Sequence, residues 1–542
     1  MTAAEHVTTL DDARFRRSDS QFFHRGEIKK ALVELAGHDE VVLYCGAGVT
    51  IDRTGLGWTD LIMHSLRPRD DENRPYIEDA DLVKLERAIG NPQRLASVLR
   101  QHCVQRYPGE AAQLDYIASA LRAELYRRNT WKGGRLVDTL SRYAVNAARA
   151  GKRITITTTN YDTYIEQAID NELKRLTAID EPRPGLHVET LGRSSPRTKV
   201  QPTAPELGVV RLVYLHGRIP PNDRVTGPIV LDEADYADNR GKTVARLMNL
   251  IDRPGIAVLV VGASLTDPPL IDAFALTRTR KPRYVLMPMQ STGLAAYPGH
   301  HVPALLKHLR GRFGLLGLIG LVPDFKVQIG QFFEELIVCE NLVDPAGYER
   351  RSYGRRLMDW WEDWEARSDN DAFIDDAFGR LRDFSADLRR RWDLGDEKID
   401  GVELVKLEIW ARWNPEKSRR LALWGSSMGV LVGRGLLRKT ELELDSGQAS
   451  VRCFTEGRPQ YVDLDEVQPP HPTTGGKRYR SRWESFLSVP VYLEDPDRSL
   501  ITGVVTLASS RSRAGSAVPT SDTLAMQVLV TEMRTLGAEL LA

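Results

Sequence analysis

The sequence predicts an α/β protein with a doubly wound parallel sheet, followed by a smaller α+β domain. From residue 23 to residue 340, short apolar runs alternate with helical patterns. Several of these runs are apolar on both faces, which is typical of parallel strands covered by helices on each side. After about residue 340, charged helical segments flank closely spaced strand patterns, and this order favours an antiparallel sheet.

The first domain is expected to contain six strands. They are the apolar runs at 41–45, 154–159, 209–215, 257–262, 284–289 and 314–322. Residues 80–150 are rich in Leu, Ala and Arg and predict a helical insertion, whereas the proline-rich residues 181–208 predict a loop. The expected organisation is a lead-in, a doubly wound domain, a helical linker and an α+β domain, at 1–22, 23–340, 341–370 and 371–542.

Strand patterns in the α+β domain are expected at six places, before a final helix at 521–542. These are residues 402–413, 421–425, 449–454, 460–464, 484–493 and 501–510. Cys453 is expected to be a buried strand residue. The tryptophan cluster WWEDW at 360–364 predicts either an oligomer contact or packing within the chain.

Composition excludes several functional classes. Lys and Arg together number 74, as do Asp and Glu, so there is no global charge to attract nucleic acid or an acidic membrane. The four cysteines, at 45, 103, 339 and 453, form no CxxC pair, which argues against a zinc ribbon or a disulfide scaffold. Because no apolar leader is apparent at the N-terminus, a cytoplasmic location is expected.

Four polar or glycine-rich motifs stand where expected strands end. They are Gly46-Ala47-Gly48-Val49-Thr50, Thr159-Asn160-Tyr161-Asp162, His216-Gly217 and Gly262-Ala263-Ser264-Leu265-Thr266-Asp267-Pro268. In an open α/β sheet, ligands bind at the carboxyl ends of the strands. The four motifs together therefore predict one crevice.

Each motif alone also has an ordinary structural explanation. The GAG segment can be a tight turn between strand and helix, and it lacks the third glycine of a dehydrogenase GxGxxG. Asn160 and Asp162 are residue types that cap helices, and His216 can be structural. Trp58 can stack on a ligand or pack in the core. The joint occurrence of the motifs at successive strand ends favours a binding site.

Residues 25–340 resemble the SIR2-like (sirtuin-type) NAD-binding domain, which has a Rossmann-like fold. The resemblance rests on GAGVT with WTDLI, TTTNYD, YLHG, VLDEADY and VGASLTDPPL, in the order of the family. No cysteine lies between 103 and 339, so the zinc module of sirtuin deacylases is missing, and YVLMPMQ replaces the usual INxxxT strand. The pattern is closer to the zinc-free, NAD-consuming SIR2-like effectors of bacterial anti-phage systems such as Thoeris.

The resemblance implies that NAD is the substrate and that no metal is needed. Nicotinamide leaves NAD as a neutral molecule, so the reaction requires stabilisation of the positive charge on the ribose and a placed water. Asn160 would orient the water and the nicotinamide ribose, and His216 would act as a base on the water or a ribose hydroxyl. Asp162 would hold its neighbours or favour the developing charge.

The resemblance also implies a set of NAD-binding residues. Backbone N–H groups of Gly46, Ala47 and Gly48 would meet the pyrophosphate, and Gly262 and Ser264 would close over the adenosine. The complete expected set is Gly46, Ala47, Gly48, Thr50, Gly262, Ser264 and Asp267.

Residues 370–542 resemble a GAF domain. The resemblance rests on LVKLEIWARWNPEKSRRLALWG, MGVLVGRGL, CFTEGRPQYVDL, FLSVPVYLED and ITGVVTLASS. It implies a small ligand, such as a cyclic nucleotide, or dimerisation. The basic and aromatic loop at 468–483 either contacts a phosphate-bearing ligand or is a solvated surface loop.

The predicted function is hydrolysis of NAD to nicotinamide and ADP-ribose by an anti-phage effector that the GAF-like domain regulates. The expected trigger is a small molecule, a cyclic nucleotide or a protein, and the expected assembly is a homo-oligomer. Neither a membrane nor nucleic acid is expected as a partner. One alternative is a non-catalytic sensor of NAD or ADP-ribose, and others are a sirtuin-type deacylase or an ADP-ribosyltransferase.

Overall fold

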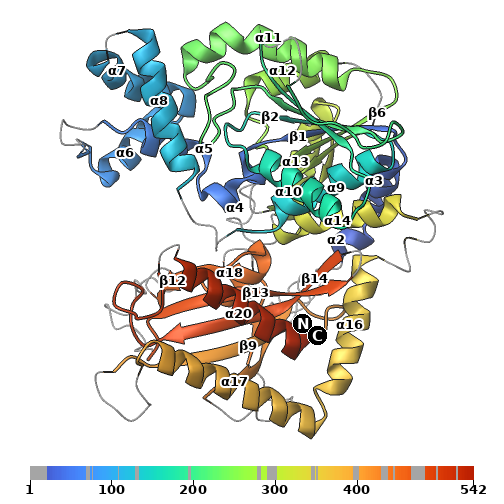
Figure 1. Cartoon of the computed structure of the whole chain (residues 1–542), viewed down its shortest axis with the longest axis vertical. Coiled ribbons are helices and arrows are strands. Elements are labelled where there is room, and N and C mark those ends of the chain that lie inside the picture. Colours follow the sequence, from blue (N-terminus) through green and yellow to red (C-terminus); the bar gives the residue numbers. More distant parts are fainter. Residues whose placement is uncertain are drawn as a thin grey trace, which may run out of the picture.

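The computed structural model places the chain in two domains, one above the other along the long axis of the molecule (Figure 1). It describes residues 21–68, 74–75, 77–107, 109–127, 133–192, 197–277, 282–289, 302–342, 348, 352–394, 402–428, 438–443, 446–464, 482–495, 498–520 and 523–542. Residues 1–20 of the expected lead-in and 468–481 of the basic loop lie outside this set. No helix among the described residues is long and apolar enough to cross a membrane.

The first domain is built on an eight-stranded sheet with the order β4-β3-β5-β2-β1-β6-β7-β8. The strands are β1 Glu40–Cys45, β2 Arg153–Thr158, β3 Gly185–Thr190, β4 Arg197–Val200, β5 Val209–Tyr214, β6 Ile256–Val261, β7 Arg283–Leu286 and β8 Ile319–Leu321. All neighbouring pairs are parallel except β3 and β4. The predicted α/β class with a largely parallel sheet is therefore confirmed.

Helices cover both faces of this sheet. One face carries α3 Gly26–Ala36, α9 Leu136–Arg149, α10 Tyr164–Ala178 and α14 Val327–Glu340, and the other carries α11 Glu233–Ile251, α12 Pro268–Leu276 and α13 Val302–Leu315. Alternate residues of β1 enter the two cores, with Val41 and Leu43 on the first face and Val42 and Tyr44 on the second. This burial on both faces explains why the strand reads as a continuous apolar run.

A separate helical group adjoins the carboxyl end of β1. It contains α5 Trp58–Ser65, α6 Asp79–Ile89, α7 Pro92–Arg106 and α8 Glu110–Leu125, which share their own hydrophobic cluster. The short η1 Ala47–Val49 and α4 Ile51–Thr54 connect this group to β1. Helix α9, within the expected insertion, instead packs against α10 and α14 on the sheet.

Two local predictions in the first domain were wrong. Residues 181–208, expected to be a loop, contain β3 and β4, because the prolines of this segment fall outside both strands. The apolar run 314–322, expected to be one strand, holds the end of α13 and the three residues of β8. Gly317, with φ of +67°, separates the two, and a short apolar run does not distinguish a helix end from a strand.

The second domain contains an antiparallel six-stranded sheet with the order β11-β10-β9-β14-β13-β12. The strands are β9 Val405–Trp413, β10 Arg420–Ser426, β11 Lys439–Glu441, β12 Gln460–Asp463, β13 Ser485–Asp495 and β14 Arg498–Ser509, and the helices are α16 Tyr353–Arg367, α17 Asp371–Arg391, α18 Ala449–Glu456 and α20 Leu524–Leu541. The expected strand at 449–454 is helix α18, so Cys453 is a buried helical residue. Gly457, with φ of +67°, ends this helix.

The tryptophan cluster packs within the chain. Trp361 lies 5.0 Å from Trp413, and Trp364 lies 5.5 Å from Trp424, measured between ring centroids. The indole of Trp360 donates to the carbonyl of Leu541 at the end of α20. Helix α16 is therefore held against both the sheet and α20. The hydrophobic cluster that includes these residues is continuous with the core beneath α14, so the two domains share a packed interface.

Candidate active site

A cavity of about 610 Å³ lies at the carboxyl ends of β1, β2, β5 and β6. This volume is within the usual range for small-molecule sites. The structure brings all ten residues predicted from sequence into the wall of this cavity: Gly46, Ala47, Gly48, Thr50, Asn160, Asp162, His216, Gly262, Ser264 and Asp267. They meet because parallel strands place their carboxyl ends at one edge of the sheet.

The loops after β1 and β6 touch backbone to backbone. The N–H of Gly46 donates to the carbonyl of Val261 at 3.0 Å, and the N–H of Gly48 donates to the carbonyl of Gly262 at 2.8 Å. A Cβ on Gly46 would lie 2.5 Å from the oxygen of Gly262, and one on Gly262 would lie 2.5 Å from the nitrogen of Val49. The glycines are thus required by the contact between the loops.

This contact changes the role expected for the glycine amides. The N–H groups of Gly46 and Gly48 were expected to meet a pyrophosphate, but both donate within the protein. The N–H groups of Val49 and Thr50 donate to the carbonyls of Gly46 and Ala47. Among residues 46–50, the N–H of Ala47 alone makes no hydrogen bond with the described residues, so it is the amide left to meet a ligand.

Asn160, Thr50 and Asp162 form a buried chain of hydrogen bonds. The amide nitrogen of Asn160 donates to the carbonyl of Gly46 at 3.2 Å and to the hydroxyl of Thr50 at 3.0 Å. That hydroxyl donates to Asp162 at 2.8 Å, and Asp162 also accepts from the N–H of Tyr164 at 3.1 Å. Asp162 therefore holds its neighbours in place, and burial raises its pKa to about 6. The Oδ1 of Asn160 accepts no hydrogen bond from the described residues.

His216 follows β5 and is buried in the cavity wall. Its ring meets Tyr236 edge to face, with 5.1 Å between centroids. Its Nε2 atom is buried and has no hydrogen-bond partner among the described residues. Burial lowers the pKa of His216 from the ordinary value of 6.5 to about 3. The imidazole is therefore neutral near pH 7, and it can accept a hydrogen bond from a ligand or a water.

Asp267 forms a second polar centre in the cavity wall. The hydroxyl of Tyr44 donates to Asp267 at 3.2 Å, and Tyr236 also hydrogen-bonds to Asp267. Burial raises the pKa of Asp267 to about 6, and its Oδ1 has no partner among the described residues. This free oxygen can accept a hydrogen bond from a ligand hydroxyl or amine.

Sequence reasoning missed Tyr44 and Tyr236 as site residues. Tyr44 follows three aliphatic residues in β1, and its position one residue before the strand end was the available signal. Tyr236 lies in the first turn of α11, whose sequence gives no sign that the side chain reaches the cavity. Trp58 lines the cavity and also packs on Tyr161, with 5.5 Å between ring centroids. Its position is therefore compatible with both expected alternatives, stacking on a ligand and packing in the core.

Replacing Gly262 with alanine tests the contact between the loops. Gly262→Ala places a methyl group 2.5 Å from the nitrogen of Val49 at a φ of +65°, so we expect a loss of stability of at least about 2 kcal/mol. The matched control is Gly255→Ala, because Gly255 has a φ of +74° but no atom within 4 Å of the added methyl group. The free energy of unfolding of both variants is measured with denaturant. Equal losses in the two variants would contradict the close contact between the loops.

The pH dependence of stability tests the burial of His216. The unfolded state binds a proton below about pH 6.5 and the folded state only below about pH 3, so the unfolded state binds more protons between these values. His216 should therefore contribute a loss of about 2 kcal/mol between pH 7 and pH 5, whereas the raised pKa values of Asp162 and Asp267 act in the opposite direction. The stability of the wild type relative to His216→Gln, measured by denaturant unfolding, should therefore fall by about 2 kcal/mol over this pH range.

The control for the titration is a histidine outside the cavity. His187, half-buried on β3, provides it as His187→Gln. If the stability difference between the wild type and His216→Gln stays the same from pH 7 to pH 5, His216 is not held neutral by burial.

Part of this site lies in a segment that is similar to a known protein family. The family model for the SIR2-like domain matches residues 154–298. No curated protein matches the chain. Within the described residues, no group of three or more His, Cys, Asp or Glu side chains could hold a metal ion. The matched segment runs from β2 through β7 and contains Asn160, Asp162, His216 and the loop after β6, so this part of the cavity wall lies in the segment that is similar to the SIR2-like domain.

Proposed function

We propose that the first domain binds NAD and hydrolyses the bond between nicotinamide and ribose. The observation that carries this proposal is the buried, neutral His216, whose free Nε2 shares a cavity with the free Oδ1 of Asn160. An imidazole and an amide oxygen that line the same cavity of about 610 Å³ are suited to hold a water and the hydroxyls of a ribose.

The chemistry requires little acid catalysis. The bond between C1′ of the ribose and the pyridinium nitrogen breaks, and its electron pair leaves with neutral nicotinamide. A water then bonds to C1′, and its proton passes to His216. A base with a low pKa is sufficient here, because the water becomes strongly acidic once its oxygen bonds to carbon. The products are nicotinamide, ADP-ribose and a proton.

The remaining wall residues position the substrate. Asp162 fixes the hydroxyl of Thr50, and through it the amide of Asn160, so that its Oδ1 faces the ligand. The free N–H of Ala47 is available for one phosphate oxygen. Asp267, held by Tyr44 and Tyr236, accepts from a hydroxyl of NAD. These assignments follow from which polar atoms the protein leaves without partners.

We further propose that residues 371–542 form a GAF-like regulatory domain and that the whole chain acts as a defence effector. The antiparallel sheet flanked by α17, α18 and α20 supports a compact second domain in packed contact with the first. The defence role rests on the resemblance to zinc-free SIR2-like effectors. An enzyme that consumes NAD needs a regulatory domain, because unregulated turnover would deplete the cell of NAD.

Substitution of the two acceptor residues tests the reaction. Asn160→Ala and His216→Ala should each lower the rate of nicotinamide release from NAD by about 100-fold or more, because each removes a group that places the attacking water. Nicotinamide is measured by chromatography, with and without lysate from phage-infected cells. The matched controls are Asn239→Ala on α11 and His187→Ala on β3, which lie outside the cavity and should retain the wild-type rate.

The outcomes separate three functions. NAD binding without nicotinamide release in any condition would contradict hydrolysis and favour a sensor of NAD. Loss of an acetyl group from a peptide would indicate a deacylase. Wild-type rates in both cavity variants would place the reaction elsewhere.

A further inference from the structure

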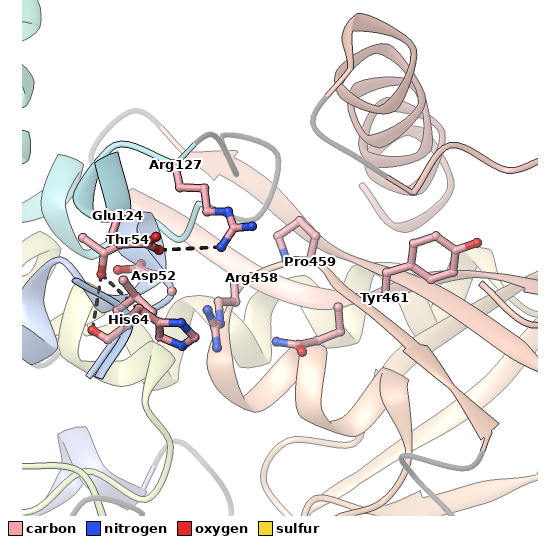
Figure 2. Close-up of a pocket in the computed structure, with 11 residues that line it drawn as sticks. Asp52, Thr54, His64, Glu124, Arg127, Arg458, Pro459 and Tyr461 are labelled. Carbon is pink, nitrogen blue, oxygen red and sulfur yellow. Dashed lines mark hydrogen bonds and ion pairs between the residues drawn. The ribbon is translucent and has the colours of Figure 1, made fainter. Parts of the chain in front are cut away.

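A second cavity, of about 340 Å³, lies between the two domains (Figure 2). Residues of the first domain and the segment Arg458–Tyr461 after α18 line it together. Thr54 and Leu56 line both this cavity and the candidate active site, so the two spaces share a wall.

Two arginines from different domains point into this space. Arg127, after α8, makes one long ion pair with Glu124 at 3.6 Å, and its side chain is 71% exposed. The Nε of Arg458 donates to Glu456 at 2.6 Å, whereas its two terminal nitrogens make no hydrogen bond with the described residues. Figure 2 shows both side chains among the residues that line this cavity. Free guanidinium donors of this kind match the geometry of phosphate and carboxylate oxygens.

Asp52 is an acidic residue in the lining of the same cavity. It lies on α4, is buried, and has an Oδ1 atom without a partner among the described residues. Burial raises the pKa of Asp52 even though Lys326 and Arg458 are near. A buried carboxylate oxygen without a partner is costly, and a hydroxyl or amine on a ligand would satisfy it. The lining of the cavity thus combines two arginines with a buried carboxyl group whose Oδ1 is without a partner among the described residues.

We propose that a small phosphate ester with a free hydroxyl, no larger than a mononucleotide, binds in this interdomain cavity. The phosphate contacts Arg127 and Arg458, and the hydroxyl donates to Asp52. A volume of about 340 Å³ is at the lower end of the range for small-molecule sites, which sets the upper limit on ligand size. Because Arg127 and Arg458 belong to different domains, one phosphate joins the domains.

The bound ester would act on the neighbouring cavity through α4. The N–H of Thr54 donates to the carbonyl of Thr50 at 3.0 Å, and the hydroxyl of Thr54 accepts from the N–H of Leu56 at 3.2 Å. Thr50 is the residue that Asn160 and Asp162 hold. A ligand that fixes Asp52 therefore fixes the start of the same helix. This regulatory consequence rests on the proposed NAD hydrolysis, whereas the binding site itself does not.

Isothermal titration of the full-length protein tests the site with three ligands. They are AMP as the phosphate ester, adenosine as the same nucleoside without phosphate, and inorganic phosphate. AMP should bind at least tenfold more tightly than either of the others. Arg127→Gln and Arg458→Gln should each weaken AMP binding at least tenfold. The matched control is Arg390→Gln, since Arg390 has an equally long ion pair with a carboxylate, at 3.5 Å, and a side chain 79% exposed on α17.

Each result decides the proposal. Equal affinity for AMP in wild type and both cavity variants would place AMP elsewhere and overturn the site. Adenosine binding as tightly as AMP would show that the phosphate is not recognised, and inorganic phosphate binding as tightly would remove the role of the hydroxyl. Nicotinamide release with and without AMP is measured in parallel, and we expect at least a threefold change in wild type that Arg127→Gln abolishes. If neither the wild type nor any variant releases nicotinamide, the proposal of NAD hydrolysis is wrong. The titration with AMP still decides whether the binding site exists.

Discussion

The close contact between the loop after β1 and the loop after β6 is the constraint on which the candidate active site depends. Gly46 and Gly48 meet Gly262 so closely that no side chain fits at any of the three positions. Their hydrogen bonds fix the start of η1, which in turn places Thr50 within reach of Asn160 and Asp162. Two strands that are neighbours in the sheet thus have their terminal loops joined as well, and the cavity floor is rigid before any ligand arrives.

Burial then sets the chemistry that this floor supports. Asp162 and Asp267 keep raised pKa values although each accepts hydrogen bonds, because desolvation outweighs them. The same desolvation keeps the imidazole of His216 neutral. Near pH 7 both carboxyls remain largely ionised, because their pKa values of about 6 lie below that pH, whereas the imidazole is neutral. Such a site suits a reaction whose positive charge is already present in the substrate, and it does not rely on a strong acid.

The positions of Asn160 and His216 could be predicted from sequence because each interrupts an apolar run at the end of a buried strand, and parallel strands collect such residues at one edge. Tyr44 and Tyr236 could not be predicted, since their contact with Asp267 depends on how α11 lies over the sheet. Helix α18 was mistaken for a strand because it has only eight residues, and a short, mostly buried run does not distinguish a helix from a strand. The reason for the glycines also required the structure, because their partner, Gly262, is more than 200 residues away.

The short helix α4 connects the two cavities. Its first residue follows Thr50, and its last, Thr54, lines both spaces. Its buried Asp52 lies near Lys326, at the start of α14, and near Arg458 of the second domain. A helix of four residues has few hydrogen bonds of its own, so its position depends on these neighbours. Any rearrangement of the segment after α18 therefore changes the environment of Asp52, and through α4 it reaches the residue that holds Asn160 without needing to cross the sheet.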